Sequence, residues 1–184
     1  MRKNFGAKPF LYPQPVFIIA TYNDDGTADA MNAAWGGISD SNQITMCISA
    51  THRTTKNVLT RGAFTVSMGT ADTVAACDYV GLVSGEKEPA KLDKAGFHAV
   101  KSEFVDAPLI AELPMAVECR LVSFDPESCR MVGEIVNVCA EEGVLTDGKV
   151  DPAKLRPITF DGQNNTYLVL GEKVGDAFSD GLHL

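Results

Sequence analysis

The chain has 184 residues, with 24 Asp or Glu against 16 Lys or Arg, so its formal net charge is −8. Its composition, 45% hydrophobic and 22% charged, is that of an ordinary globular protein and argues against global disorder. An acidic chain repels phosphate backbones, so we expect no nucleic-acid partner. The length predicts a single domain over residues 1–184.

Neither a membrane anchor nor a secretion signal is expected. No stretch approaches the ~20 apolar residues of a membrane helix, and no apolar segment follows the charged start at Arg2 and Lys3. The number of cysteines is odd and no CxxC occurs, which leaves zinc-ribbon, iron–sulfur and thioredoxin-type motifs unsupported. Cys119 and Cys139 lie in apolar, strand-like segments, so we expect them to be buried and reduced in a cytoplasmic protein, with a redox thiol as the alternative. The cysteines are Cys47, Cys77, Cys119, Cys129 and Cys139.

Strands dominate the predicted elements. In the run from Ile44 to Ser49, Ile44, Met46 and Ile48 share one face while polar or small residues occupy the other, a period typical of a half-buried strand. The turn sequence Asn-Asp-Asp-Gly at 23–26 predicts a hairpin. The predicted strands cover residues 15–21, 28–35, 44–49, 64–68, 115–123 and 131–139.

Helices are predicted to be short and few. The first covers 54–61 and ends at Gly62, a residue favoured after a helix C-terminus. The second covers 70–80 with Thr70 as its N-cap, a third covers 89–95, and 108–112 forms one turn. Residues 81–98 form a polar excursion, read as a surface loop. Regular strand–helix alternation is missing, so we predict a mainly β fold, an antiparallel barrel with a few covering helices.

Several familiar motifs are incomplete. Residues 143–149 have the spacing of a phosphate-binding loop, but Val150 stands where Ser or Thr should hold magnesium. No GxGxxG follows a strand and no GxSxG is present. His52, His98 and His183 lack the paired spacing of metal ligands, so no metal site is predicted.

The strongest local motif is Ser-Ala-Thr-His-Arg-Thr-Thr-Lys-Asn at 49–57, which follows a strand and opens a helix. Arg53 offers a planar fork for phosphate oxygens, Lys56 adds a point charge, and free N–H groups at a helix start favour an anion. The alternative is a capped helix with a solvated basic face.

A second motif is Asn-Ala-Ala-Trp-Gly-Gly at 32–37. Its small residues would allow a flat ligand to approach the backbone, and the glycines permit an unusual turn. Trp35 is the only tryptophan, and its alternative role is a core or interface anchor.

The order and spacing of these motifs resemble the flavin reductase-like, FMN-binding split-barrel family, specifically its flavoredoxin group. The resemblance covers nearly the whole chain. It runs through Pro15-Val16, Asn32 to Trp35, Ile48-Ser49, His52 to Val58, Gly62 to Ser67, Val83 to Gly85, Lys94 to Phe97, Ala107 to Ile110, Glu118-Cys119, Gly133 to Ile135, Asp147-Gly148 and Tyr167 to Glu172, ending near Gly181.

This resemblance implies a six-stranded Greek-key antiparallel barrel that binds FMN non-covalently as a homodimer. Ser67 stands where many relatives carry Asn, which separates it from the family pattern. The implied phosphate and ribityl anchors are Ser49, Arg53, Thr54, Lys56 and Asn57. The implied wall of the isoalloxazine is Asn32, Ala33, Ala34 and Trp35, with Ser67 as a further contact and Ser84, Gly85 and Lys91 closing the site from the excursion.

A bound flavin would carry the chemistry, which explains why no acid–base pair or catalytic side chain stands out. The resemblance implies electron transfer from NADH or NADPH, or from a redox protein, through FMN to an acceptor. A nicotinamide stacked on the flavin would need no dinucleotide-binding domain. Two alternatives stay open: a flavin- or haem-binding carrier or sensor without turnover, and a structural dimer that has lost its ligand.

Overall fold

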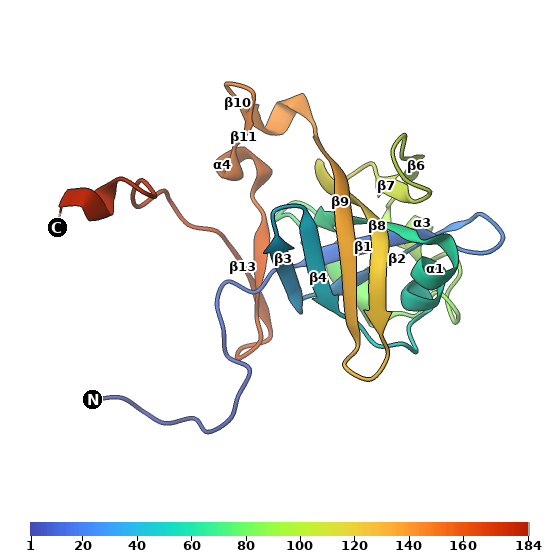
Figure 1. Cartoon of the computed structure of the whole chain (residues 1–184), viewed down its shortest axis with the longest axis horizontal. Coiled ribbons are helices and arrows are strands. Elements are labelled where there is room, and N and C mark those ends of the chain that lie inside the picture. Colours follow the sequence, from blue (N-terminus) through green and yellow to red (C-terminus); the bar gives the residue numbers. More distant parts are fainter. Residues whose placement is uncertain (184) are drawn as a thin grey trace.

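The computed structural model describes residues 1–183, and their central feature is an antiparallel sheet of seven strands in the order β2-β1-β5-β8-β9-β4-β3. The sheet curls into a half barrel, and hairpins joined by longer crossovers give it a Greek-key connectivity (Figure 1). The strands are β1 (Phe17–Tyr22), β2 (Ala28–Ala33), β3 (Gly36–Asp40), β4 (Gln43–Cys47), β5 (Ala63–Met68), β8 (Met115–Asp125) and β9 (Arg130–Ala140).

The predicted antiparallel split barrel is confirmed, and the alternation that indicated it is seen in the packing. Ile44, Met46 and Ile48 all enter the main core, where they meet Phe64 and Met131. Seven strands pair rather than the six that the resemblance implied, because the Gly-Gly segment after Trp35 continues as β3 along β4.

Strand β1 is buried on both faces, so its side chains divide between two cores. Phe17 and Ile19 join the main core inside the curled sheet. Ile18 and Ala20 join a second core on the other face, which α2 (Val74–Leu82) and α3 (Lys91–Ala95) cover. This double burial explains why the strand reads as a continuous apolar run.

Helix α1 (Arg53–Arg61) confirms the first predicted helix to within one residue. Gly62 adopts φ 68°, the left-handed conformation that glycine adopts without a Cβ penalty, and its N–H bonds to the carbonyl of Val58. The helix packs on β1 and β5. Its first residues therefore lie at one end of the curled sheet, directly after β4.

The second predicted helix began too early. Residues 70–73 form a turn closed by the Thr73 N–H to the Thr70 carbonyl, 3.2 Å, and Thr70 also forms an isolated β-bridge with Pro157. Helix α2 therefore starts at Val74, with Thr73 rather than Thr70 in the capping position. The pairing of Thr70 with the distant Pro157 therefore outweighs the local preference for helix.

The helical turn predicted for 108–112 is wrong. Residues 108–110 form β7 (Pro108–Ile110), which pairs with β6 (Ala99–Lys101). The 81–98 excursion is also more than a surface loop, because Leu92 and Phe97 are buried in the second core and α3 lies within it. The predicted third helix is present but starts at Lys91.

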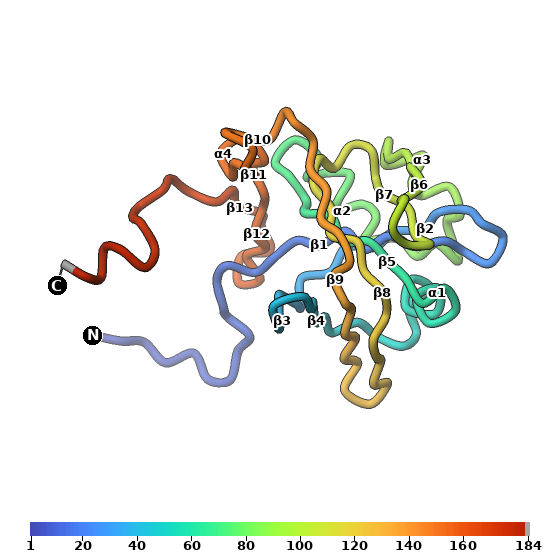
Figure 2. The backbone as a smooth tube through the Cα atoms, turned by 45° about the horizontal axis from the view of Figure 1, so that its top comes forward, coloured from blue at the N-terminus to red at the C-terminus, as the bar shows by residue number. Residues whose placement is uncertain are grey.

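The remainder of the chain lies beside one end of the sheet. A two-stranded hairpin, β12 with β13, is joined to the body where Pro15 bridges Thr159. Among the described residues, no helix is long and apolar enough to cross a membrane. Figure 2 shows both ends of the chain projecting from the same side of the body. The other elements are η1 (Glu142–Val144), β10 (Leu145–Thr146), β11 (Lys149–Val150), α4 (Pro152–Leu155), β12 (Ile158–Asp161), β13 (Thr166–Val169) and η2 (Asp180–His183).

Candidate functional site

A cavity of about 520 Å³ opens between the ends of β2 and β4, helix α2 and the β12–β13 hairpin. Its volume lies in the range typical of ligand pockets. Its lining is largely apolar, which suits an aromatic ligand. The lining residues are Met31, Asn32, Ala33, Ala34, Trp35, Cys47, Ile48, Ser49, His52, Asp78, Gly81, Leu82, Phe160 and Tyr167.

A second, more polar cavity of about 280 Å³ adjoins the first, since both are lined by Met31, Asn32, His52, Gly81 and Leu82. It lies at the start of α1. Together the two cavities bring ten of the thirteen predicted site residues into one region. Asn32, Ala33, Ala34, Trp35 and Ser49 line the first cavity, and Arg53, Thr54, Ser84, Gly85 and Lys91 line the second.

Three predicted site residues lie outside the lining of both cavities. Lys56 is exposed on α1 and its Nζ pairs with Glu86 at 2.9 Å. Asn57 is buried and donates to Asn23 at 2.8 Å. Ser67 is buried within β5, and its hydroxyl has no hydrogen-bond partner among the described residues. A cofactor role for these three stays a prediction.

The first turn of α1, beside the second cavity, has backbone N–H groups without intrahelical partners. The first intrahelical bond runs from the Lys56 N–H to the His52 carbonyl, 3.2 Å, so the N–H groups of Arg53, Thr54 and Thr55 precede the helical ladder. His52 makes no side-chain cap to a described residue, and the first turn carries no acidic side chain. This helix start is therefore suited to an anion.

The threonine hydroxyls at the start of α1 form hydrogen bonds within the protein. Thr55 donates to the Ser49 carbonyl at 2.7 Å, and Thr54 donates to Asp29 at 2.7 Å. Ser49 and Thr51 contact each other through their hydroxyls, 2.9 Å apart. These bonds fix the loop before α1 and leave the backbone N–H groups as the donors of the first turn.

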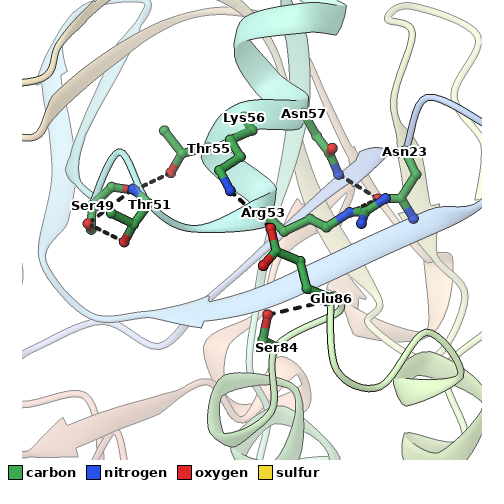
Figure 3. Close-up of polar contacts among 9 residues, drawn as sticks. All are labelled: Asn23, Ser49, Thr51, Arg53, Thr55, Lys56, Asn57, Ser84 and Glu86. Carbon is green, nitrogen blue, oxygen red and sulfur yellow. Dashed lines mark hydrogen bonds and ion pairs between the residues drawn. The ribbon is translucent and has the colours of Figure 1, made fainter.

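Arg53 is oriented by Asn23, a residue of the β1–β2 turn that the sequence analysis did not select. Its Nε donates to Asn23 Oδ1 at 2.9 Å, and the same oxygen accepts from Asn57 (Figure 3). Among the described residues, no carboxylate lies within ion-pair distance of the guanidinium, in contrast to Lys56, which Glu86 neutralises. Arg53 thus keeps its remaining donors for a ligand.

A buried ion pair lies next to the second cavity. Lys91 Nζ lies 2.8 Å from Asp29 Oδ1, and their side chains are 4% and 2% exposed. The other Asp29 oxygen accepts from Thr54. At Gly85 an added Cβ would lie 2.4 Å from Asp29 Oδ1, so only glycine allows the excursion to approach this closely. Asp29 therefore connects β2, α1 and α3.

The first cavity has a polar group that sequence reasoning missed. Tyr167 of β13 donates to Asp78 of α2 at 2.6 Å. Burial, followed by this bond, raises the pKa of Tyr167 to about 12, so the phenol stays neutral at ordinary pH. Phe160 lies beside it, with ring centroids 5.9 Å apart. Phe160 and Asp78 carried no motif and Tyr167 entered only as part of the resemblance, because only the β12–β13 hairpin brings Phe160 and Tyr167 to α2.

The opposite side of the cavity is set by close packing of α2 on β2. Asn32 donates to the Cys77 carbonyl at 3.0 Å, and an added Cβ at Gly81 would lie 2.8 Å from Asn32 Cβ. Trp35 is half exposed, so its indole can contact a ligand. Within residues 1–183, no group of three or more His, Cys, Asp or Glu side chains is arranged to hold a metal ion.

Comparison with known proteins agrees with this geometry. The model of the flavin reductase like domain matches residues 10–157. The chain therefore belongs to the flavin reductase-like family. Its mainly β fold is the split barrel of that family, and the family and fold support a flavin-binding redox role.

Solved structures of flavoredoxins are very similar to the chain. The flavoredoxin of Desulfovibrio vulgaris (Miyazaki F) is 36% identical, with a TM-score of 0.94 over 98% of this chain and 100% of that one. The flavoredoxin of Methanosarcina acetivorans is 29% identical, with a TM-score of 0.86 over 98% and 97%. An FMN-binding protein from Thermus thermophilus shares the fold at 20% identity, with a TM-score of 0.76 over 96% of this chain and 99% of that one.

Proposed function

We propose that the chain binds FMN across the two adjoining cavities, with the phosphate at the start of α1 and the isoalloxazine in the larger cavity beside Trp35. The observation that carries the proposal is the continuity of a largely apolar cavity with a helix start that holds Arg53. FMN has the same two parts, a flat ring and a dianionic phosphate.

The charges of the described residues fit the phosphate. The N–H groups of Arg53, Thr54 and Thr55 would donate to it along the positive end of the α1 dipole. The Arg53 guanidinium, held in place by Asn23, would add charge-assisted bonds. Lys91 would contribute little net charge, because Asp29 already neutralises it.

The larger cavity would orient the ring and exclude water from one face. Ala33 and Ala34 leave backbone groups accessible, and Trp35 would cover part of the ring. Tyr167, neutral and bonded to Asp78, would close the cavity from the β12–β13 hairpin without bringing a negative phenolate to it.

Bound FMN supplies hydride and electron-transfer chemistry that side chains lack. We propose a flavin oxidoreductase or electron carrier that receives electrons from NADH, NADPH or a redox protein, and that works as a homodimer. The names of the two flavoredoxins support an electron-transfer role. We place the protein in the cytoplasm, where its free thiols would stay reduced.

The binding proposal is tested with Arg53→Ala. Losing a hydrogen bond from a charged group costs about 1.5–3 kcal/mol, so FMN affinity should fall by about 10- to 150-fold, measured by fluorescence titration of the apoprotein. Riboflavin, which lacks the phosphate, should bind both proteins alike. Arg120→Ala, an exposed arginine on β8, is the matched control. Equal FMN affinity in Arg53→Ala and Arg120→Ala would refute the phosphate site.

The electron donor is tested by mixing the FMN-loaded protein with NADH or NADPH without oxygen. Bleaching of the flavin absorbance at a rate that saturates with nicotinamide supports a reductase. A flavin that bleaches with dithionite but with neither nicotinamide would instead define a carrier served by another protein. A chain that takes up no FMN would overturn both.

A further inference from the structure

Two arms of the chain extend from the body without folding back onto it. Residues 1–11, which we call the basic arm, expose Phe5, Phe10 and Leu11. Residues 171–183, the acidic arm, expose Val174, Phe178 and Leu182; Phe178 is fully exposed. Figures 1 and 2 both show the arms projecting from the same side of the body.

The described contacts of each arm are local. Lys3 lies over the Phe5 ring at 5.4 Å, and Phe5 meets Phe10 edge to face. In the acidic arm, Lys173 pairs with Asp176 at 2.5 Å, and the Asp176 N–H bonds to Asp180. Exposed aromatic and aliphatic side chains in such number are typical of a surface that meets a partner.

The two arms carry opposite charge. Residues 1–11 contain Arg2, Lys3 and Lys8 and no acidic residue. Residues 171–183 contain three acidic residues, Glu172, Asp176 and Asp180, against the single Lys173. In a pair of chains related by a two-fold axis, the basic arm of one copy can lie against the acidic arm of the other, and the contact occurs twice.

The apolar surface continues from the acidic arm into the body. Leu168, Val169 and Leu170, in and after β13, are each nearly half exposed. The basic arm begins where the Tyr12 hydroxyl donates to Asp161 of β12 at 2.5 Å. Both arms are therefore rooted at the β12–β13 hairpin, which also forms one wall of the larger cavity.

We propose that the occupant of this surface is a second copy of the chain, and that the basic arm of each copy pairs with the acidic arm of the other. This rests on the homodimer of the proposed function and names the segments that hold it together. The apolar side chains supply burial and the charges fix which arm meets which. Because the arms are rooted at the hairpin, pairing would also hold Phe160 and Tyr167 at the cavity.

The test reverses one arm at a time. One variant, Arg2→Glu with Lys3→Glu and Lys8→Glu, makes both arms acidic. The other, Glu172→Lys with Asp176→Lys, makes both arms basic. Each variant alone should dimerise about tenfold or more weakly in sedimentation equilibrium, because like charges then oppose each other. Mixing the two variants should restore a heterodimer of wild-type strength. All substituted positions are exposed, so folding should be unaffected, and far-UV circular dichroism checks this.

Two further measurements complete the test. Glu103→Lys with Glu142→Lys changes the net charge by the same amount as Glu172→Lys with Asp176→Lys, but at exposed positions of the body, and should leave dimerisation unchanged. Phe178→Ser should weaken the dimer although the side chain touches little in one chain. Arm pairing is overturned if the reversed variants dimerise as strongly as the wild type. It is also overturned if mixing them does not restore the dimer while a chain with both arms reversed dimerises normally, because the arms would then pair within one chain. A wild-type chain that stays monomeric would overturn the dimer as well, whereas FMN titration reports separately on the flavin site.

Discussion

Replacing Lys91 with Met would leave the Asp29 carboxylate buried beneath the second cavity without its cation. The two groups are 2.8 Å apart and almost fully buried, so water cannot replace the lost partner. Removing one partner of a buried ion pair costs about 3–5 kcal/mol. Asp29 would keep the hydroxyl of Thr54 as a donor, which places the expected loss toward the lower end of that range.

Urea unfolding followed by circular dichroism measures the loss. With a slope of about 1–3 kcal/mol per molar urea, the midpoint should fall by at least about 1 M. Asp29→Asn should destabilise the protein similarly, because it leaves the ammonium unpaired. The double variant should lose less than the sum of the two single variants, since the charges are removed together.

Lys56→Met is the matched control, because it makes the same replacement in an exposed ion pair. Lys56 and Glu86 are each about half exposed, so solvent screens their attraction and the urea midpoint should hardly move. Equal midpoints for Lys91→Met and Lys56→Met would refute the reasoning, since burial would then have no effect on the cost of breaking the pair.

Three further predictions concern the core, the cavity wall and the thiols. Gly133→Ala should cost about 1–3 kcal/mol in urea unfolding, because the new Cβ would lie 2.4 Å from Phe64 Cζ; an unchanged midpoint would mean that the ring moves aside freely. The Tyr167 phenol should ionise near pH 12, seen as a tyrosinate absorbance that the Tyr167→Phe variant lacks. Burial and the bond to Asp78 raise this pKa, so the stabilisation is complete below about pH 10 and is lost as the pH rises through 12; a transition at 10 would contradict the buried bond. Exposed Cys47 should react quickly with a disulfide reagent in the folded protein. Burial raises the pKa of the Cys119 thiol to about 12, so this thiol should react only after unfolding. If the folded Cys119→Ser variant showed one fast-reacting thiol fewer than the wild type, this prediction would be contradicted.

Local patterns predicted the elements whose signals are local. The alternation around Met46 defined a strand, and Gly62 marked the end of α1, because side-chain direction and a left-handed φ are set within a few residues. The elements that were missed depend on distant partners. Residues 108–110 become a strand by pairing with 99–101, and α2 starts late because Thr70 bridges Pro157.

The residues of the site show the same distinction between local patterns and distant partners. The motifs at 32–35 and 49–54 supplied eight residues that line the two cavities, because those residues are contiguous at the ends of β2 and β4. Asp29 and Asp78 carried no motif, Asn23 entered only as a turn residue, and Tyr167 entered only as part of the resemblance. Their partners lie 25 to 89 residues away in the chain, so only the fold brings them together. The hydrogen bond from the Thr54 hydroxyl to the Asp29 carboxylate was hidden for the same reason.

The scarcity of positive charge gives the site its selectivity for an anion. The chain carries a net charge of −8, and the cations near the cavities are mostly neutralised: Lys91 by Asp29 and Lys56 by Glu86. Arg53 differs because the neutral amide of Asn23 holds it, so its guanidinium keeps its full charge beside the free N–H groups of α1. An acidic surface around one such cation would repel a polyanion and still accept a single phosphate. Replacing Asn23 with Asp would supply the missing carboxylate, and by this argument it should weaken FMN binding while leaving riboflavin binding unchanged.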